Sequence, residues 1–362
     1  MKFELKTRQV CLFFIAFMPI TKLFMVPSVM AGYANEDMWI SALISCLLDI
    51  GTLCALIYAC KLADAPFFTI LERSFGKTAS KIIMAIYFIF FTLKAFLPIN
   101  EQKDYVEFTL YTLLSTTFYF FPFFIICFYF CTKKLRAVGR VAEICWLFSL
   151  VGFIILITLS FSNSDFTAIL PIGANGFSNI FKGTMHSLPW FGDSVYLMFF
   201  LGEFAYHKKD GLKILGSYLL GVLMILIFMV IFYCIFTSIA HRQRFALTEI
   251  SKYTTVINNT GRFDYLGILM ILLSSVFSIS MPLFFGSRIL NYIFNFKKRW
   301  IAPLITVGIQ LLTSIFFSEF LSTMETIVTD YCIYGFIVMQ NLLPICSIFI
   351  AKRRKNYEHQ TC

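Results

Sequence analysis

Four ionisable side chains lie deep inside long apolar runs of the 362-residue sequence: Lys22, Asp49, Lys94 and Asp193. An ionisable group in hydrocarbon is costly, and such groups usually pair with one another or mark the path of a substrate or ion. Lys and Asp together can neutralise each other, hold the two charged ends of a zwitterion, or relay a proton. For Asp49 and Lys94 we favour a structural pair over a proton relay.

Lys22 and Asp193 each lie beside residues that break helices. Lys22 stands between Pro19 and Pro27, and Asp193 follows Pro189 and Gly192. Proline removes a backbone donor and crowds the preceding turn, so both helices should kink or break there. At about 1.5 Å per residue, Lys22 and Asp193 lie about 14 Å and 10 Å below the outer ends of their runs. Similar depth and opposite charge permit pairing, with a structural ion pair and a substrate or ion role equally open.

The apolar run 264–293 carries three further candidates for ion binding, Ser274, Ser275 and Ser278. Serines in membrane helices usually hydrogen-bond to their own backbone or to a neighbouring helix. Ion coordination by these hydroxyl groups is the less favoured alternative.

The composition defines the elements that must carry these residues. Apolar residues make up 59% of the chain and charged residues 14%, against roughly 45–50% and about 25% in soluble domains. The apolar runs are continuous rather than alternating, which favours spanning helices of about 20 residues. We therefore predict an all-α polytopic membrane protein that forms a single domain over residues 1–362 in the lipid bilayer.

Ten spans are predicted, and the positive charges orient them. The predicted spans are 9–31, 38–61, 80–100, 113–132, 141–161, 186–206, 213–236, 264–293, 300–318 and 327–350. With the N-terminus inside, 21 of the 30 Lys and Arg residues fall in cytoplasmic segments and six in outside segments. Because positive residues concentrate on the cytoplasmic side, both termini are predicted to be cytoplasmic.

Several function classes are disfavoured by the sequence. The net charge of +10 lies mainly in short loops between apolar runs, so we predict no nucleic-acid partner. The eleven Cys residues form no Cys-x-x-Cys motif and lie mostly in apolar runs, where Cys acts as a small hydrophobe. No nucleophile elbow, phosphate-binding loop or zinc-protease motif occurs. We expect no enzyme, no metal site, no catalytic residue and no cofactor.

The two predicted breaks fall in corresponding positions of two five-span halves, residues 9–161 and 186–350. Five spans per half invert the second half relative to the first. Secondary transporters built from inverted repeats place their substrate site between such paired, discontinuous helices.

The sequence resembles the endospore germination permeases, the GerAB-type B subunits of germinant receptors in the amino acid–polyamine–organocation transporter superfamily. The resemblance runs along nearly the whole chain and rests on the order of several short motifs. These are Glu36-Asp37-Met38-Trp39-Ile40-Ser41, Pro66, Thr69-Ile70-Leu71-Glu72, Phe75-Gly76-Lys77, Gly139-Arg140, Ala142-Glu143, Leu170-Pro171, Phe191-Gly192-Asp193 and Gly261-Arg262-Phe263-Asp264.

The resemblance implies a LeuT-like 5+5 inverted repeat with spans 1 and 6 broken, and a pocket between spans 1, 6 and 8 for an amino acid or similar nutrient. It also implies the inner spore membrane and A-type and C-type receptor subunits as partners. The implied substrate-binding residues are Ile20, Thr21, Lys22, Leu23, Phe24, Trp190, Phe191, Gly192 and Asp193.

This chain departs from the family pattern at both breaks. Thr21-Lys22-Leu23-Phe24 replaces the usual glycine-containing break, and Asp193 stands where Glu is more usual. The Lys22 ammonium could replace a bound sodium ion, as a lysine does in sodium-independent relatives of this fold, or could bind a substrate carboxylate.

Two other functions remain open. One is a stand-alone amino-acid transporter that is sodium-independent or proton-coupled. The other is a scaffold in which the buried charges only hold helices together.

Overall fold

The structure, a computed structural model, describes residues 3–63, 65–110, 116–252, 264–317 and 320–346. These residues form helices joined by short connections, and their one β-type contact is an isolated bridge between Leu5 and Phe204.

The first half of the chain contains helices up to α6 and the second half begins with α7. The first-half elements are α1 (Thr7–Phe17), η1 (Ile20–Lys22), α2 (Val26–Ala34), η2 (Asn35–Asp37), α3 (Met38–Leu62), α4 (Phe67–Leu110), α5 (Thr116–Cys131), α6 (Leu135–Ser160), η3 (Phe161–Asn163) and η4 (Phe166–Ile169). The second-half elements are α7 (Gly176–Ser187), η5 (Leu188–Trp190), α8 (Val195–Phe199), α9 (Asp210–Phe236), η6 (Thr237–Arg242), α10 (Ala246–Lys252), α11 (Asp264–Phe294), α12 (Ile301–Phe316), α13 (Leu321–Thr326), η7 (Ile327–Tyr331), α14 (Ile333–Ile337) and η8 (Val338–Leu342).

Several helices have the length and apolar character of membrane spans, which agrees with the predicted helical membrane class. Among the described residues there are five such helices, and six if a pair bent by 55° is counted as one span. The five are Val26–Leu62, Phe67–Val106, Leu135–Asn163, Asp210–Arg242 and Gly267–Phe294, and the bent pair is Thr323–Tyr331 with Ile333–Cys346. Phe120–Cys131 and Ile301–Phe316 are shorter apolar helices. The count of ten spans stays a prediction.

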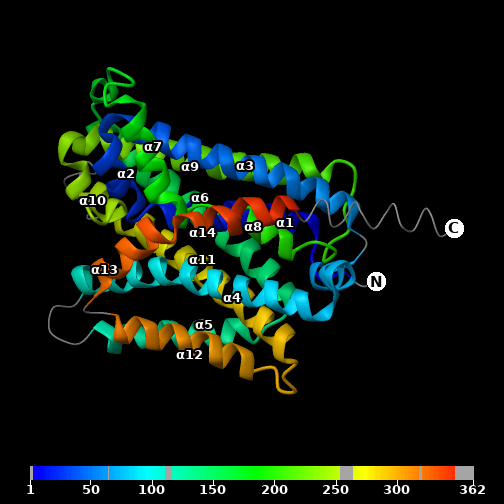
Figure 1. Cartoon of the computed structure of the whole chain (residues 1–362). Coiled ribbons are helices and arrows are strands. Elements are labelled where there is room, and N and C mark those ends of the chain that lie inside the picture. The colour runs from blue at the N-terminus through cyan, green and yellow to red at the C-terminus, as the bar shows by residue number, and fades with distance from the viewer. Residues whose placement is uncertain (1–2, 64, 111–115, 253–263, 318–319, 347–362) are drawn as a thin grey trace.

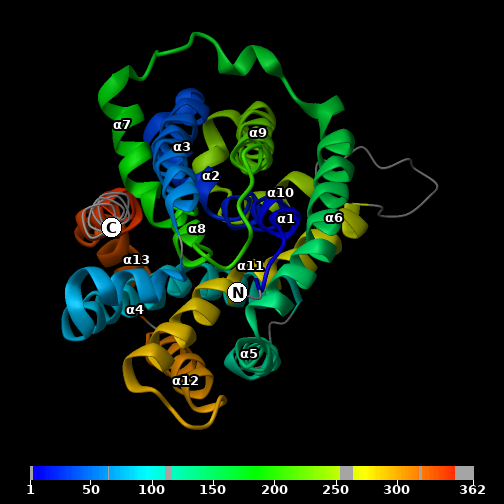
Figure 2. The same ribbon diagram turned by 90° about the vertical axis from the view of Figure 1, so that its right-hand side faces the viewer.

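The long helices run roughly alongside one another (Figure 1), and a view along them shows their packing (Figure 2). Helix α11 packs against α4, α6, α5 and α12, while α1 packs between α6 and α9. Helices α3 and α9 lie side by side, and α5 and α12 form a pair at the edge of the bundle. The short first helix α1 is therefore surrounded by longer ones.

Both predicted helix breaks are present. Helix α1 ends at Phe17 and α2 begins at Val26, with Pro19 in the connection and Pro27 in the first turn of α2. Proline is tolerated in a first turn, where its missing N–H has no helical partner. In the second half, α7 ends at Ser187 and α8 begins at Val195, so the backbone between them is free to bend around Asp193.

Three predicted boundaries differ in the structure. The predicted span 186–206 is displaced, because helix α7 already begins at Gly176, between the predicted spans 141–161 and 186–206, and α8 ends at Phe199. Polar residues on α7 hid it from a hydropathy-based prediction, although it packs against α2 and α3. Between the predicted spans 38–61 and 80–100, residues 67–79 form the start of α4, which kinks at Gly76 with φ +79°. The predicted span 327–350 is bent rather than continuous.

Aromatic rings fix the second break against the first and against α11. Phe17 on α1 meets Tyr196 on α8 edge-on with ring centroids 4.7 Å apart, and Phe13 meets Phe200 at 5.1 Å. Phe285 on α11 lies 5.4 Å from Tyr196. Such pairs contribute about 0.5–1.5 kcal/mol each beyond area burial. This packing holds the two breaks at the same level of the bundle.

Candidate functional site

The two helix breaks are joined by an ion pair between Lys22 and Asp193. Lys22 ends η1, its side chain is completely buried, and its ammonium group donates to Asp193 Oδ2. The same Nζ donates to Thr21 Oγ1 at 3.0 Å and faces the Phe191 ring, 5.5 Å from its centroid. A buried charge needs this kind of compensation, because a carboxylate or ammonium without a partner is strongly destabilising.

Lys94 of α4 brings a second ammonium group to Asp193. Its Nζ lies 3.4 Å from Asp193 Oδ1 and donates to the carbonyl oxygen of Phe191. The Asp193 carboxylate therefore lies between two lysines that come from different helices. We predicted that Lys94 would pair with Asp49, and this is wrong, since Lys94 points to the break instead.

Asp49 of α3 holds the same break through backbone amides. Its Oδ2 accepts hydrogen bonds from the N–H groups of Gly192 at 2.8 Å and Asp193 at 3.3 Å, and from the Tyr218 hydroxyl at 2.8 Å. Asp49 and Asp193 lie close together, and the two lysines bring the formal charge of the cluster to zero. We call Lys22, Asp49, Lys94 and Asp193 the buried charge cluster.

Gly192 is required by the geometry of this break. Its φ is +80°, a conformation that residues with a side chain rarely adopt. A Cβ atom at this position would overlap the buried side chain of Gln340. Gln340 comes from η8, and its Nε2 donates to the Phe191 carbonyl oxygen at 2.9 Å. The bend that exposes the Phe191 carbonyl oxygen is thus held by a hydrogen bond from η8.

Trp190 is anchored by another buried carboxylate. Its Nε1 donates to Glu101 Oε1 on α4, and both side chains are buried. This hydrogen bond fixes the indole ring beside the break, where Trp190 lines the site.

The other residues predicted at the first break lie in its buried backbone. Ile20 and Leu23 are fully packed, and the Phe24 carbonyl oxygen accepts a hydrogen bond from Ala246 N at 3.0 Å. Ala246 begins α10, which runs to Lys252. The break is therefore covered by α10.

The three serines bind helix backbone. Ser274 Oγ donates to the Cys145 carbonyl oxygen on α6 at 3.0 Å, and Ser275 Oγ to Leu272 at 2.7 Å. Ser278 Oγ lies 3.4 Å from the carbonyl oxygen of Ala16 at the end of α1. Ser278 is thus the serine that reaches the first break.

The space between the breaks is small. A cavity of about 10 Å³ is lined by Phe17, Thr21, Lys94, Pro98, Pro189, Trp190, Asp193, Tyr196, Ser278, Ile279 and Pro282. This is room for about one water molecule. The structure is therefore closed around the buried charge cluster, and a nutrient-sized ligand enters only if the helices separate.

Three residues of the site were missed by sequence reasoning: Glu101, Tyr218 and Gln340. Glu101 and Gln340 carried a usable signal, because each is a polar residue at the edge of or within an apolar run. Tyr218 carried none, since it is one of 17 Tyr residues and only the packing of α9 on α3 brings it to Asp49.

The comparisons with known proteins agree with a transporter-like fold. A solved structure of a mutant of the manganese transporter of Eremococcus coleocola is similar, with a TM-score of 0.55 and 10% sequence identity. The similarity covers 94% of this chain and 78% of the transporter. No curated protein sequence matches the chain. The family model described as spore germination protein matches residues 4–326. The chain therefore belongs to the spore germination protein family and is a membrane permease by family and fold.

Proposed function

We propose that this protein is the nutrient-binding permease subunit of a spore germinant receptor, and that it binds an amino-acid-like nutrient between the two helix breaks. The observation that carries the proposal is the buried ion pair between Lys22 and Asp193, which joins the two breaks. Membership of the spore germination protein family supports the germination role.

In this proposal Asp193 acts as an internal carboxylate that a ligand displaces. Its two oxygens face Lys22 and Lys94, which is the arrangement that a nutrient carboxylate needs. The carboxylate of a bound nutrient would replace Asp193 as the partner of one lysine. The amino group of the nutrient would then face Asp193. Such an exchange keeps every buried charge paired, so it avoids the cost of an isolated ion.

Ligand binding must widen the closed site, and this requires the buried helix α8 to shift against the aromatic rings of α1 and α11 that pack on it. Helix α8 has five residues, Val195–Phe199, between two non-helical stretches. A ligand shifts a closed–open equilibrium only by its different affinity for the two states. We propose that this shift is what the protein reports to its A-type and C-type receptor partners.

The proposed setting is the inner spore membrane, with both termini in the cytoplasm. The excess of Lys and Arg on one side of the predicted spans supports this orientation. The two proposed repeats, 9–161 and 186–350, each contribute one break to the site.

The second candidate is a stand-alone amino-acid transporter that needs no sodium. The observation that favours it is the buried Lys22 ammonium beside Asp193, which can take the place of a bound cation. Manganese, which the structural neighbour is named for, is not proposed here, because two ammonium groups at the site repel a divalent cation.

The test is ligand-induced thermal stabilisation of the purified full-length protein with a panel of amino acids and nucleosides. Stabilisation follows RT ln(1 + [L]/Kd), so a ligand at 100 times its Kd adds about 2.7 kcal/mol. We expect one or a few compounds with a carboxylate to raise the unfolding temperature. The shift should vanish in the double variant Lys22→Met, Asp193→Asn, which removes the pair and keeps the formal charge of the buried charge cluster at zero, with Lys94 and Asp49 remaining.

Lys182→Met is the matched control, because Lys182 is exposed on α7. It should keep the full ligand response. A ligand shift that survives in the double variant would contradict the proposed site. If no compound stabilises the protein while the double variant is as stable as the wild type, the charges form a scaffold only. Uptake of the stabilising compound into liposomes containing this chain alone would favour the transporter instead.

A further inference from the structure

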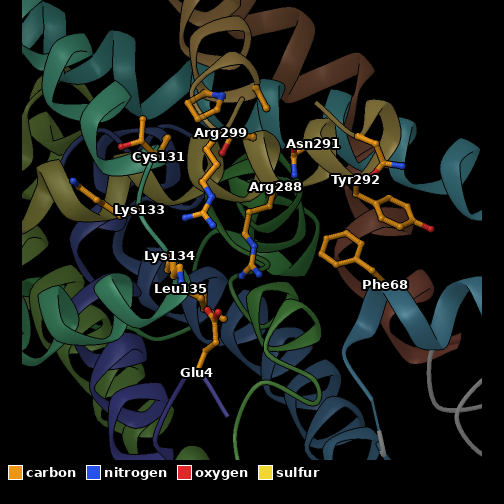
Figure 3. Close-up of a pocket in the computed structure, with 15 residues that line it drawn as sticks. Glu4, Phe68, Cys131, Lys133, Lys134, Leu135, Arg288, Asn291, Tyr292 and Arg299 are labelled. Atoms are coloured by element: carbon orange, nitrogen blue, oxygen red, sulfur yellow. The ribbon is translucent and has the colours of Figure 1, made fainter. Parts of the chain in front are cut away.

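An open cleft lies at the end of the bundle where the N-terminal segment meets the α5–α6 and α11–α12 connections (Figure 3). Its volume is about 440 Å³, far larger than the cavity between the helix breaks. Its walls come from the last turn of α5, the first turns of α6 and α12, and the last two turns of α11. The cleft is separate from the buried charge cluster.

Cationic side chains dominate the cleft. Lys133, Lys134, Arg288 and Arg299 line it, against one carboxylate, Glu4. In Figure 3 the guanidinium groups of Arg288 and Arg299 extend from the α11 side of the cleft toward its interior. Arg288 of α11 and Arg299 of the α11–α12 connection therefore reach into a hollow that Lys133 and Lys134 of the α5–α6 connection also line. This excess of positive charge favours an anion that accepts several hydrogen bonds, such as a phosphate group.

The helix ends strengthen this preference. Helices α6 and α12 both open on the cleft with their first turns, which include Leu135 and Ala302. In neither helix does a side chain cap the N-terminus. The positive end of a helix dipole adds to the attraction of the four cations for an anion.

Exposed aromatic rings place the cleft at the level of lipid headgroups. Tyr129 is 63% exposed in the last turn of α5, and Lys133 Nζ lies over its ring, 3.8 Å from the centroid. Trp300 is exposed immediately before α12. Tyr and Trp concentrate at the membrane–water interface, where their rings sit among headgroups. The outer faces of α5 and α12 are apolar and exposed, which suits contact with acyl chains.

We propose that this cleft binds the phosphate headgroup of an anionic phospholipid, with its acyl chains along α5 and α12. Basic pockets between spanning helices are suited to such headgroups. A lipid is preferred over a free phosphate compound because the cleft combines cations with interfacial rings and an apolar flank.

Arg288 links the cleft to the segment that follows the second helix break. Its guanidinium lies 3.6 Å from Glu203 Oε1, and the Glu203 carbonyl oxygen accepts the backbone N–H groups of Glu4 and Leu5 at 3.0 Å each. A headgroup phosphate at Arg288 competes with the Glu203 carboxylate. Lipid binding therefore changes the position of Glu203, whose backbone holds Glu4 and Leu5.

The test measures binding of dioctanoyl phosphatidylglycerol to the full-length purified protein by thermal stabilisation. Dioctanoyl phosphatidylcholine and inorganic phosphate are measured at the same concentrations. We expect stabilisation by phosphatidylglycerol at concentrations where the other two have no effect. In the double variant Lys133→Gln, Arg299→Gln, the affinity for phosphatidylglycerol should fall about fivefold for each cation removed, since each cation contributes on the order of 1 kcal/mol.

Lys208→Gln, Lys209→Gln is the matched control, because these exposed lysines precede α9 outside the cleft. It should bind phosphatidylglycerol like the wild type. Equal losses in the two double variants, or equal stabilisation by phosphatidylcholine, would overturn the site. Equal stabilisation by inorganic phosphate would overturn the assignment to a lipid.

Two further measurements do not depend on the stability of the double variant Lys133→Gln, Arg299→Gln. Native mass spectrometry of the wild type, given equal amounts of both lipids, should retain phosphatidylglycerol in preference to phosphatidylcholine, and equal retention would contradict the proposal. Glu203→Gln removes the competitor of the phosphate at Arg288, so it should tighten phosphatidylglycerol binding severalfold. Unchanged or weaker binding would contradict the contact with Arg288.

Discussion

The carboxylate of Asp49, on the unbroken helix α3, accepts a hydrogen bond of 2.8 Å from the backbone amide of Gly192 in the break between α7 and α8. The neighbouring amide of Asp193 bonds to the same oxygen. A side chain on a rigid helix thus fixes the bend that presents Asp193 to its lysines. Any motion that withdraws Asp193 from Lys22 must also weaken these bonds, so Asp49 couples the break to the helix behind it.

The ion pair between Lys22 and Asp193 should be visible in a double-mutant cycle. Lys22→Met or Asp193→Asn alone leaves an uncompensated charge in the interior, and we expect each to destabilise the protein by about 3–5 kcal/mol. The double variant should recover part of this loss, because the formal charge of the buried charge cluster returns to zero, with Lys94 and Asp49 remaining. Unfolding temperatures of the four purified proteins measure the cycle, and additive losses would show that the pair contributes no coupling.

Gly192→Ala should destabilise the protein more than its backbone angle alone requires. A left-handed φ costs an alanine about 1–2 kcal/mol, and the new Cβ would also displace Gln340 from the Phe191 carbonyl oxygen. Gly173→Ala is the matched control, since Gly173 has φ +83° and a Cβ there would meet no atom within 4 Å in the part of the chain that the structure describes. Thermal unfolding should therefore show a larger loss at position 192, and equal losses at both positions would exclude a steric role for Gln340.

Tyr218→Phe should weaken the support of Asp49. The Tyr218 hydroxyl donates to a buried carboxylate at 2.8 Å, and a hydrogen bond to a charged group contributes about 1.5–3 kcal/mol. Tyr87→Phe is the control, because Tyr87 is equally buried but, among the described residues, its hydroxyl has only long contacts, 3.4 Å to the Met339 carbonyl oxygen and 3.8 Å to Met198 Sδ. Unfolding temperatures should rank Tyr218→Phe clearly below Tyr87→Phe, and the reverse ranking would contradict the role of Tyr218.

The crossing of α6 and α11 should depend on glycine at position 152. A Cβ on Gly152 would lie 2.9 Å from the carbonyl oxygen of Gly267 on α11, and small residues are what allow helix backbones to approach in membranes. Gly152→Ala should therefore lower the unfolding temperature. A Cβ on Gly216 of α9 would meet no atom of the described residues within 4 Å, so Gly216→Ala should be neutral or stabilising, since alanine favours helix by about 1 kcal/mol. A neutral Gly152→Ala would mean that the two helices can separate at no cost.

Much of the architecture could be predicted from local features. Apolar runs of spanning length indicated a helical membrane protein, and Pro19, Pro27, Pro189 and Gly192 indicated the breaks, because proline and glycine act on the backbone wherever they stand. Helix α7 was not predicted, because its order does not depend on a local feature of its sequence. Its polar residues carry no spanning signal, and it is ordered by packing against α2 and α3.

The sequence by itself determined which side chains had to find partners. A lysine or aspartate within an apolar run cannot remain alone in a bilayer, so Lys22, Asp49, Lys94 and Asp193 could be singled out without a structure. Which of them meet was decided only by the tertiary structure. Lys94 turned to Asp193 and Phe191 rather than to Asp49, because a broken helix offers carbonyl and amide groups that an intact helix uses internally. Depth along a span is a one-dimensional quantity, whereas the pairing of these charges depends on how α3, α4 and the two breaks are rotated toward one another.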